Sequence, residues 1–90
     1  MDERVLRRGR VVDAHREPIP AALVSVEWGT APTPDIARLT NEAGEFQVAL
    51  PPGHFRIVAV TEDGRSGQIE VEGGAGDEIV LHMDAAAPEP

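Results

Sequence analysis

Apolar and polar residues alternate over short segments of this chain, and proline or glycine separates one segment from the next. In residues 22–28, for example, Val24, Val26 and Trp28 occupy every second position. A period of two places such residues on one face of a β-strand, because successive side chains point to opposite faces. The same pattern recurs in segments 5–13, 22–28, 36–40, 45–50, 54–61, 68–72 and 78–83. Since no long segment has the period of a helix, the chain is predicted to be all-β with seven strands.

The residues between these segments predict how the strands are connected. Residues 13–20 contain Pro18 and Pro20, and residues 51–53 read Pro-Pro-Gly, so neither stretch fits a central strand. Seven short strands at this spacing are typical of two antiparallel sheets packed face to face. The residues expected to point into the core are Val11, Val24, Val26, Phe46, Val48, Leu50, Phe55, Ile57, Ala59, Ile69, Val71, Ile79 and Leu81.

Size and charge narrow the classes of protein to which the chain could belong. Ninety residues suffice for one domain, which we place at residues 1–83. Residues 84–90 consist of alanine, proline and acidic residues and are predicted to form a disordered tail or linker. The net charge of −8 repels phosphate, so nucleic acid is not expected as a partner. Membrane insertion is not expected either, because no apolar run approaches the roughly 18 residues of a membrane span.

The start of the chain bears on where the protein works. It is charged and lacks the apolar stretch of a secretory signal. A complete chain of this kind is expected in the cytoplasm, whereas an excised domain of a secreted protein would be extracellular or periplasmic. The chain contains no cysteine, so disulfides do not decide between the two compartments.

Four stretches, taken in order, resemble a known family. Residues 9–13 read Gly-Arg-Val-Val-Asp, and residues 19–26 contain a proline turn followed by a strand with paired valines. Residues 40–46 read Thr-Asn-Glu-Ala-Gly-Glu-Phe, and residues 50–57 read Leu-Pro-Pro-Gly-His-Phe-Arg-Ile. In this order and spacing they resemble the carboxypeptidase regulatory-like domain over residues 9–83.

The resemblance implies a prealbumin-like β-sandwich with Greek-key connectivity. It also implies a non-catalytic module, since such domains accompany enzymes, receptors and surface proteins as folding aids, spacers or interaction domains. The peptidase activity of carboxypeptidases belongs to a different and larger domain. We therefore expect a component of a larger assembly or multidomain protein, with no cofactor.

The residues give no support to covalent or catalytic chemistry. Relatives of this fold that form an isopeptide bond use a lysine, and the chain has none. Transthyretin-related hydrolases use a tyrosine-bearing C-terminal motif, and the chain has no tyrosine. His15, His54 and His82 lack the short spacing of metal-ligand pairs, so we expect them to face solvent rather than to bind a metal.

Trp28 and the loop 29–35 are the first candidates for partner contact. Trp28 shares its parity with two valines, which favours a position at one end of the core; the alternative is an exposed platform on which a sugar stacks. Pro32 and Pro34 lower the cost of ordering the loop on binding, although the loop can equally be a plain connection. A carbohydrate-binding module is therefore the alternative to a protein-interaction or spacer module.

Arginines at the start of the chain are the second candidate. Arg7, Arg8 and Arg10 precede or begin the first strand, whereas acidic residues crowd the last two. Such charges can block edge-to-edge pairing of sheets, which is one interpretation. The other is that the basic start of one copy meets the acidic end of a second copy or of a protein partner, in a complex that salt weakens.

Overall fold

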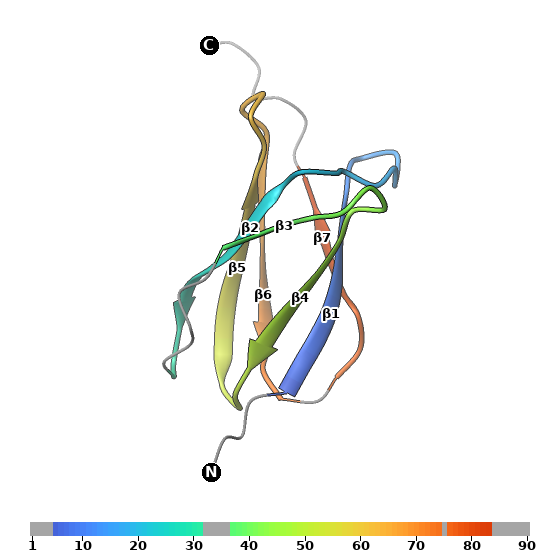
Figure 1. Ribbon diagram of the computed structural model, residues 1–90. Helices are drawn as coiled ribbons and strands as arrows, with labels where there is room; N and C mark the ends of the chain where they lie inside the picture. Colours follow the sequence, from blue (N-terminus) through green and yellow to red (C-terminus); the bar gives the residue numbers. More distant parts are fainter. Residues whose placement is uncertain (1–4, 32–36, 75, 84–90) are drawn as a thin grey trace.

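The computed structural model describes residues 5–31, 37–74 and 76–83, and these residues contain seven strands and no helix. The strands are β1 (Val5–Val12), β2 (Leu23–Gly29), β3 (Arg38–Leu39), β4 (Glu45–Leu50), β5 (His54–Val60), β6 (Ser66–Glu72) and β7 (Ile79–His82). They form a three-stranded sheet in the order β4-β1-β7 and a four-stranded sheet in the order β3-β2-β5-β6 (Figure 1). The prediction of an all-β sandwich is confirmed.

One strand pair departs from the antiparallel arrangement that we expected. β7 runs parallel to β1, with Gly9 opposite Ile79 and Val12 opposite His82, whereas the other strand pairs are antiparallel. The connection after β6 crosses to the other sheet at the end where β1 begins, so β7 must run in the direction of β1 (Figure 1). The Greek-key connectivity stays a prediction.

The core lies between the two sheets and follows the predicted alternation closely. Nine of the predicted inward residues are buried, namely Val11, Val24, Phe46, Leu50, Phe55, Ile57, Ala59, Ile79 and Leu81. Four are partly buried at its margin, namely Val26, Val48, Ile69 and Val71. The structure adds Val12, Ile19, Ala22 and Met83, which lie at strand ends or in connections. Alternation within a strand cannot identify such residues, because they lie where the strand pattern stops.

The connection from β3 to β4 is held by Thr40 and Asn41. The buried Thr40 hydroxyl accepts from the Ala22 amide at 2.9 Å and donates to the Ile19 carbonyl at 2.7 Å. Asn41 Oδ1 accepts from the amides of residues 43 and 45, each at 2.9 Å. Gly44 has a φ of 72°, which a side chain would disfavour. These contacts hold the chain in the turn that leads into β4.

The two sides of the sandwich differ. On one side β6 and β7 approach so closely that a Cβ atom added to Gly67 would collide with the carbonyl oxygen of His82. On the other side β3 is two residues long and pairs only with Leu23 and Val24 among the described residues. The sandwich is therefore closed between β6 and β7 and open between β4 and β2.

Candidate binding surfaces

Arg7 is a structural residue, which corrects its assignment as a partner contact. It lies on the inward face of β1 and is only 8% exposed. Its guanidinium donates to the carbonyl oxygens of Glu72 at 2.8 Å, Gly74 at 3.1 Å and Asp77 at 2.7 Å. Since these acceptors belong to the end of β6 and to the connection toward β7, Arg7 fixes that connection across the end of the sandwich. The alternation of β1 could have indicated this inward position from the sequence, because Arg7 lies on the same face of the strand as Val11.

Arg8 and Arg10 lie on the outer face of the three-stranded sheet, where both are exposed. Arg10 forms an ion pair with Glu78 at 3.8 Å. Because β1 and β7 are neighbours in one sheet, the basic start and the acidic end of the chain meet within a single copy. This contact engages Arg10, whereas Arg8 forms no ion pair within the described residues and stays a candidate for the predicted intermolecular contact.

Trp28 lies on the surface, so its expected position at the end of the core is wrong. Its side chain is 52% exposed. The pairing of β2 with β5 shifts between Val26, which lies opposite Ile57, and Trp28, which lies opposite Arg56. This bulge adds a residue to β2, and the added residue reverses the parity on which the prediction rested.

Charged residues surround Trp28 on the outer face of the four-stranded sheet. Arg56, opposite Trp28, pairs with Glu70 at 3.2 Å and Glu27 at 3.5 Å. The hydrogen bonds to Glu70 and then to Glu27 raise the pKa of Arg56 above its ordinary value, so it stays cationic at any physiological pH. The tryptophan therefore lies beside groups that could hydrogen-bond a polar ligand.

An apolar row crosses the opposite end of the same outer face. Leu23 of β2 lies opposite Leu39 of β3 on one side and Val60 of β5 on the other. Directly opposite residues in antiparallel strands share a face, so the three side chains are neighbours. They are 41%, 64% and 44% exposed, respectively. Together with Trp28 they form what we call the outer apolar surface.

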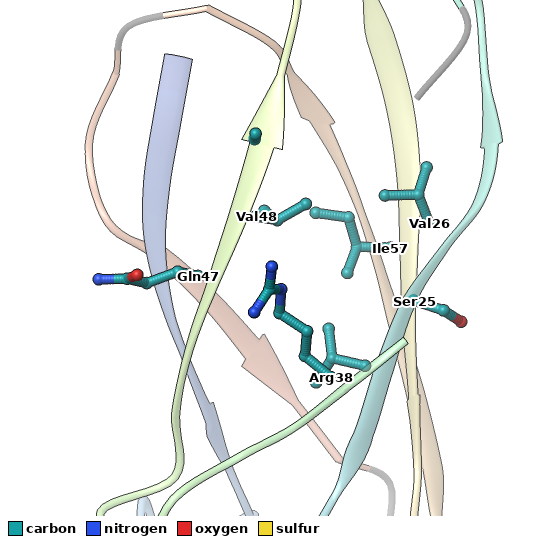
Figure 2. Close-up of a pocket in the computed structure, with 8 residues that line it drawn as sticks. Ser25, Val26, Arg38, Gln47, Val48 and Ile57 are labelled. Carbon is teal, nitrogen blue, oxygen red and sulfur yellow. The ribbon is translucent and has the colours of Figure 1, made fainter. Parts of the chain in front are cut away.

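A small cleft of about 90 Å³ opens on the unclosed side of the sandwich (Figure 2). Its lining residues are Val24, Ser25, Val26, Arg38, Gln47, Val48, Ala49 and Ile57. Most are aliphatic, and Arg38 of β3 is the charged member. The cleft is too small for an extended ligand, but it leaves the margin of the core accessible next to β4.

The remaining candidates from the sequence are the prolines of the loop 29–35 and the three histidines. Pro32 and Pro34 lie outside the described residues. His15, His54 and His82 are exposed, as expected, and no group of three potential metal ligands occurs among the described residues. The described part of the chain also contains no helix that is long and apolar enough to cross a membrane.

The fold and these surfaces define a small immunoglobulin-like β-sandwich module. The model of the carboxypeptidase regulatory-like domain family matches residues 8–85, nearly the whole chain. The chain therefore belongs to this family, as the resemblance implied. The family is a non-catalytic module, compatible with a spacer or an interaction domain. A search of the curated proteins found no match.

Proposed function

We propose that this chain is a protein-interaction module whose main contact is the outer apolar surface. The observation that carries this proposal is the grouping of exposed hydrophobic residues. Of the six large hydrophobic side chains exposed among the described residues, four lie on the outer face of one sheet: Leu23, Trp28, Leu39 and Val60. Single exposed hydrophobic residues are ordinary on a soluble protein, but neighbouring ones such as Leu23, Leu39 and Val60 are typical of an interaction site, and Trp28 lies at the other end of the same face.

The composition of this face also fits a protein partner. Tryptophan is enriched among the residues that contribute most to binding energy, and a polar rim usually surrounds them. Here Glu27, Arg56 and Glu70 supply charged groups next to Trp28. A partner surface with an apolar centre and basic residues at its rim would complement this face, since the chain as a whole is acidic.

Matched leucine substitutions test the proposal. Leu39→Ser removes part of the outer apolar surface, whereas Leu6→Ser makes the same change at a leucine of similar exposure (62% against 64%) on β1. The wild type and both variants are used to capture proteins from the source cell, and the captured proteins are quantified. We expect proteins that Leu39→Ser loses by tenfold or more and Leu6→Ser retains, about the effect of losing one apolar anchor. Equal capture by all three would contradict the proposal.

Carbohydrate binding is a second candidate because Trp28 is exposed. An aromatic ring on a sheet face can stack against a sugar, and the neighbouring carboxylates can accept hydrogen bonds from the hydroxyl groups of the sugar. Trp28 is the sole tryptophan, so a titration of its fluorescence with soluble glycans reports directly on this position. A saturable change would favour a carbohydrate-binding module, whereas an unchanged spectrum across the glycans would leave the protein partner as the function.

A further inference from the structure

β4 is an edge strand of the three-stranded sheet and borders the open side of the sandwich. On the closed side β6 approaches β7 closely at Gly67, and Arg7 occupies the last carbonyl of β6. β3 offers an edge of two residues. β4 has six residues, pairs only with β1 among the described residues, and contains neither proline nor lysine. Natural proteins usually block such an edge or use it.

The free backbone groups of β4 can be identified from its pairing. The Val11 amide donates to the Gly44 carbonyl at 2.8 Å, so odd-numbered residues of β1 direct their backbone groups toward β4. Their partners Phe46, Val48 and Leu50 are consequently bonded to β1. The backbone groups of residues 45, 47 and 49 then point away from β1, because alternate residues of a strand face alternate sides.

Asn41 satisfies the first of these three residues. The Glu45 amide donates to Asn41 Oδ1 at 2.9 Å, and the Glu45 carbonyl accepts from the Asn41 amide at 3.1 Å. Among the described residues, no hydrogen bond is found to the outward backbone groups of Gln47 and Ala49. The accessible edge therefore presents two donors and two acceptors, on residues 47 and 49.

We propose that a second copy of this chain binds at this edge, with the two β4 strands antiparallel. In one register, the free backbone N–H and C=O groups of residues 47 and 49 in one copy lie opposite those of the other copy. Gln47 of each copy lies opposite Ala49 of the other, so all eight groups pair in four hydrogen bonds, and Val48 meets Val48 of the second copy on the two-fold axis. This register also keeps inward residues opposite inward residues, which a shift by one position would not.

The cleft supplies apolar contact to the same arrangement. Val48 is only partly buried and borders the cleft, so its contact with the second copy would cover the exposed margin of the core. Gln47 and Ala49 are uncharged, so no like charges meet in the pairing itself. Repulsion opposes the dimer, because each copy carries a net charge of −8 and Arg38 borders the cleft beside Val48, so raising the salt concentration should strengthen the dimer.

Cysteine crosslinking tests the register. The chain has no native cysteine, so a single introduced cysteine can crosslink only between copies. Val48→Cys places two thiols in a non-hydrogen-bonded pair on the axis, where a disulfide can form. Gln47→Cys places each thiol opposite an alanine. We expect the Val48→Cys variant to crosslink at least tenfold faster than Gln47→Cys under mild oxidation. Equal rates, or faster crosslinking of Gln47→Cys, would overturn the proposal.

A charge exchange tests the interface without crosslinking. In the variant Gln47→Lys/Ala49→Lys the new lysines face each other twice across the two-fold axis, and we expect dimerisation to weaken about tenfold or more. In Gln47→Lys/Ala49→Glu each lysine faces a glutamate of the other copy, and dimerisation should return.

The two added lysines of Gln47→Lys/Ala49→Lys make the net charge of each copy less negative. If general repulsion between the copies controlled dimerisation, this variant would therefore dimerise more strongly than the wild type. Sedimentation equilibrium measures all three proteins. A wild type that stays monomeric at millimolar concentration and high salt would overturn the proposal, as would equal dimerisation of the two variants.

The salt dependence separates this dimer from contacts between Arg8 and an acidic surface. A complex held by Arg8 should weaken as salt rises, since exposed charges are screened within about 8–10 Å at physiological ionic strength. A complex that weakens with salt and loses stability in Arg8→Gln would contradict pairing at β4.

Discussion

The closed and open sides of the sandwich differ in how the edges of their sheets are packed. Between β6 and β7 the backbones come together because Gly67 has no side chain, and Arg7 bonds the carbonyls that follow. Between β4 and β2 a strand of two residues leaves a cleft and an accessible backbone. In this chain a glycine and a buried arginine close one side, whereas the two-residue length of β3 leaves the other side open.

The two sides should therefore differ in what they contribute: the closed side to the stability of the fold, and the open side to association with other molecules. Groups on the closed side are buried and bonded within the chain, so changes there should affect folding. Groups on the open side and on the outer apolar surface are exposed, so changes there should affect association and leave folding nearly unchanged. Substitutions in the two regions and a change of pH test that division.

The largest effect is expected from Gly67→Ala. The new Cβ atom would meet the His82 carbonyl and the Cα atom of Met83, which are backbone atoms and cannot rotate away. Separating β6 from β7 should reduce the free energy of unfolding by about 3 kcal/mol. Gly64→Ala is the control: it meets nothing within 4 Å but has a φ of 89°, so it should cost about 1 kcal/mol. Urea unfolding measures both, and equal losses would show that the close contact is not essential.

Arg7→Gln is expected to have the next largest effect. Three backbone carbonyls lose their donor at the end of the sandwich, which should reduce the free energy of unfolding by about 2 kcal/mol. Arg8→Gln removes the same charge from the neighbouring, exposed position and should change stability by less than about 0.5 kcal/mol. Denaturant titrations of the two variants compare them directly. Similar losses in both would mean that Arg7 acts through its charge alone.

The smallest effect concerns pH and distinguishes the turns at the two sides. Asp63, in the turn before β6, accepts from the Thr61 hydroxyl and from Arg65 Nε at 3.1 Å, and these bonds lower its pKa below 3.8. A carboxyl whose pKa is lowered by folding stabilises the folded state above its unfolded pKa, and this contribution disappears as pH falls through the folded pKa. Acidification below about pH 4 should therefore loosen this turn.

The turn before β4 provides the comparison, because Asn41 holds it with a neutral amide. Amide hydrogen exchange, corrected for intrinsic rates, should show protection of Arg65 decreasing with acidification while that of Glu45 stays constant. Asp63→Asn should remove the difference. Parallel loss of protection in both turns would indicate general acid unfolding instead.

The sequence predicted the strands well because alternation and turn residues are local properties. Three features that set the surfaces were not predicted. Strand parity places Arg7 on the same face as Val11, but the carbonyl groups that bind its guanidinium lie 65 to 70 residues away in the sequence. The bulge at Trp28 reverses a parity that is correct up to Val26. The parallel pairing of β7 depends on where the preceding connection crosses between sheets, which is a property of the whole chain.

The parallel pairing of β1 and β7 has a mechanical consequence. β1 begins at one end of the sandwich and β7 ends at the other, so tension along the chain pulls the two neighbours past each other (Figure 1). The hydrogen bonds between residues 9–12 and 79–82 then carry the load together, in shear, rather than breaking one after another. If the two strands were antiparallel, both attachment points would lie at one end, and tension would break the hydrogen bonds one at a time. This strand order gives a module inserted between two other domains a natural resistance to stretching.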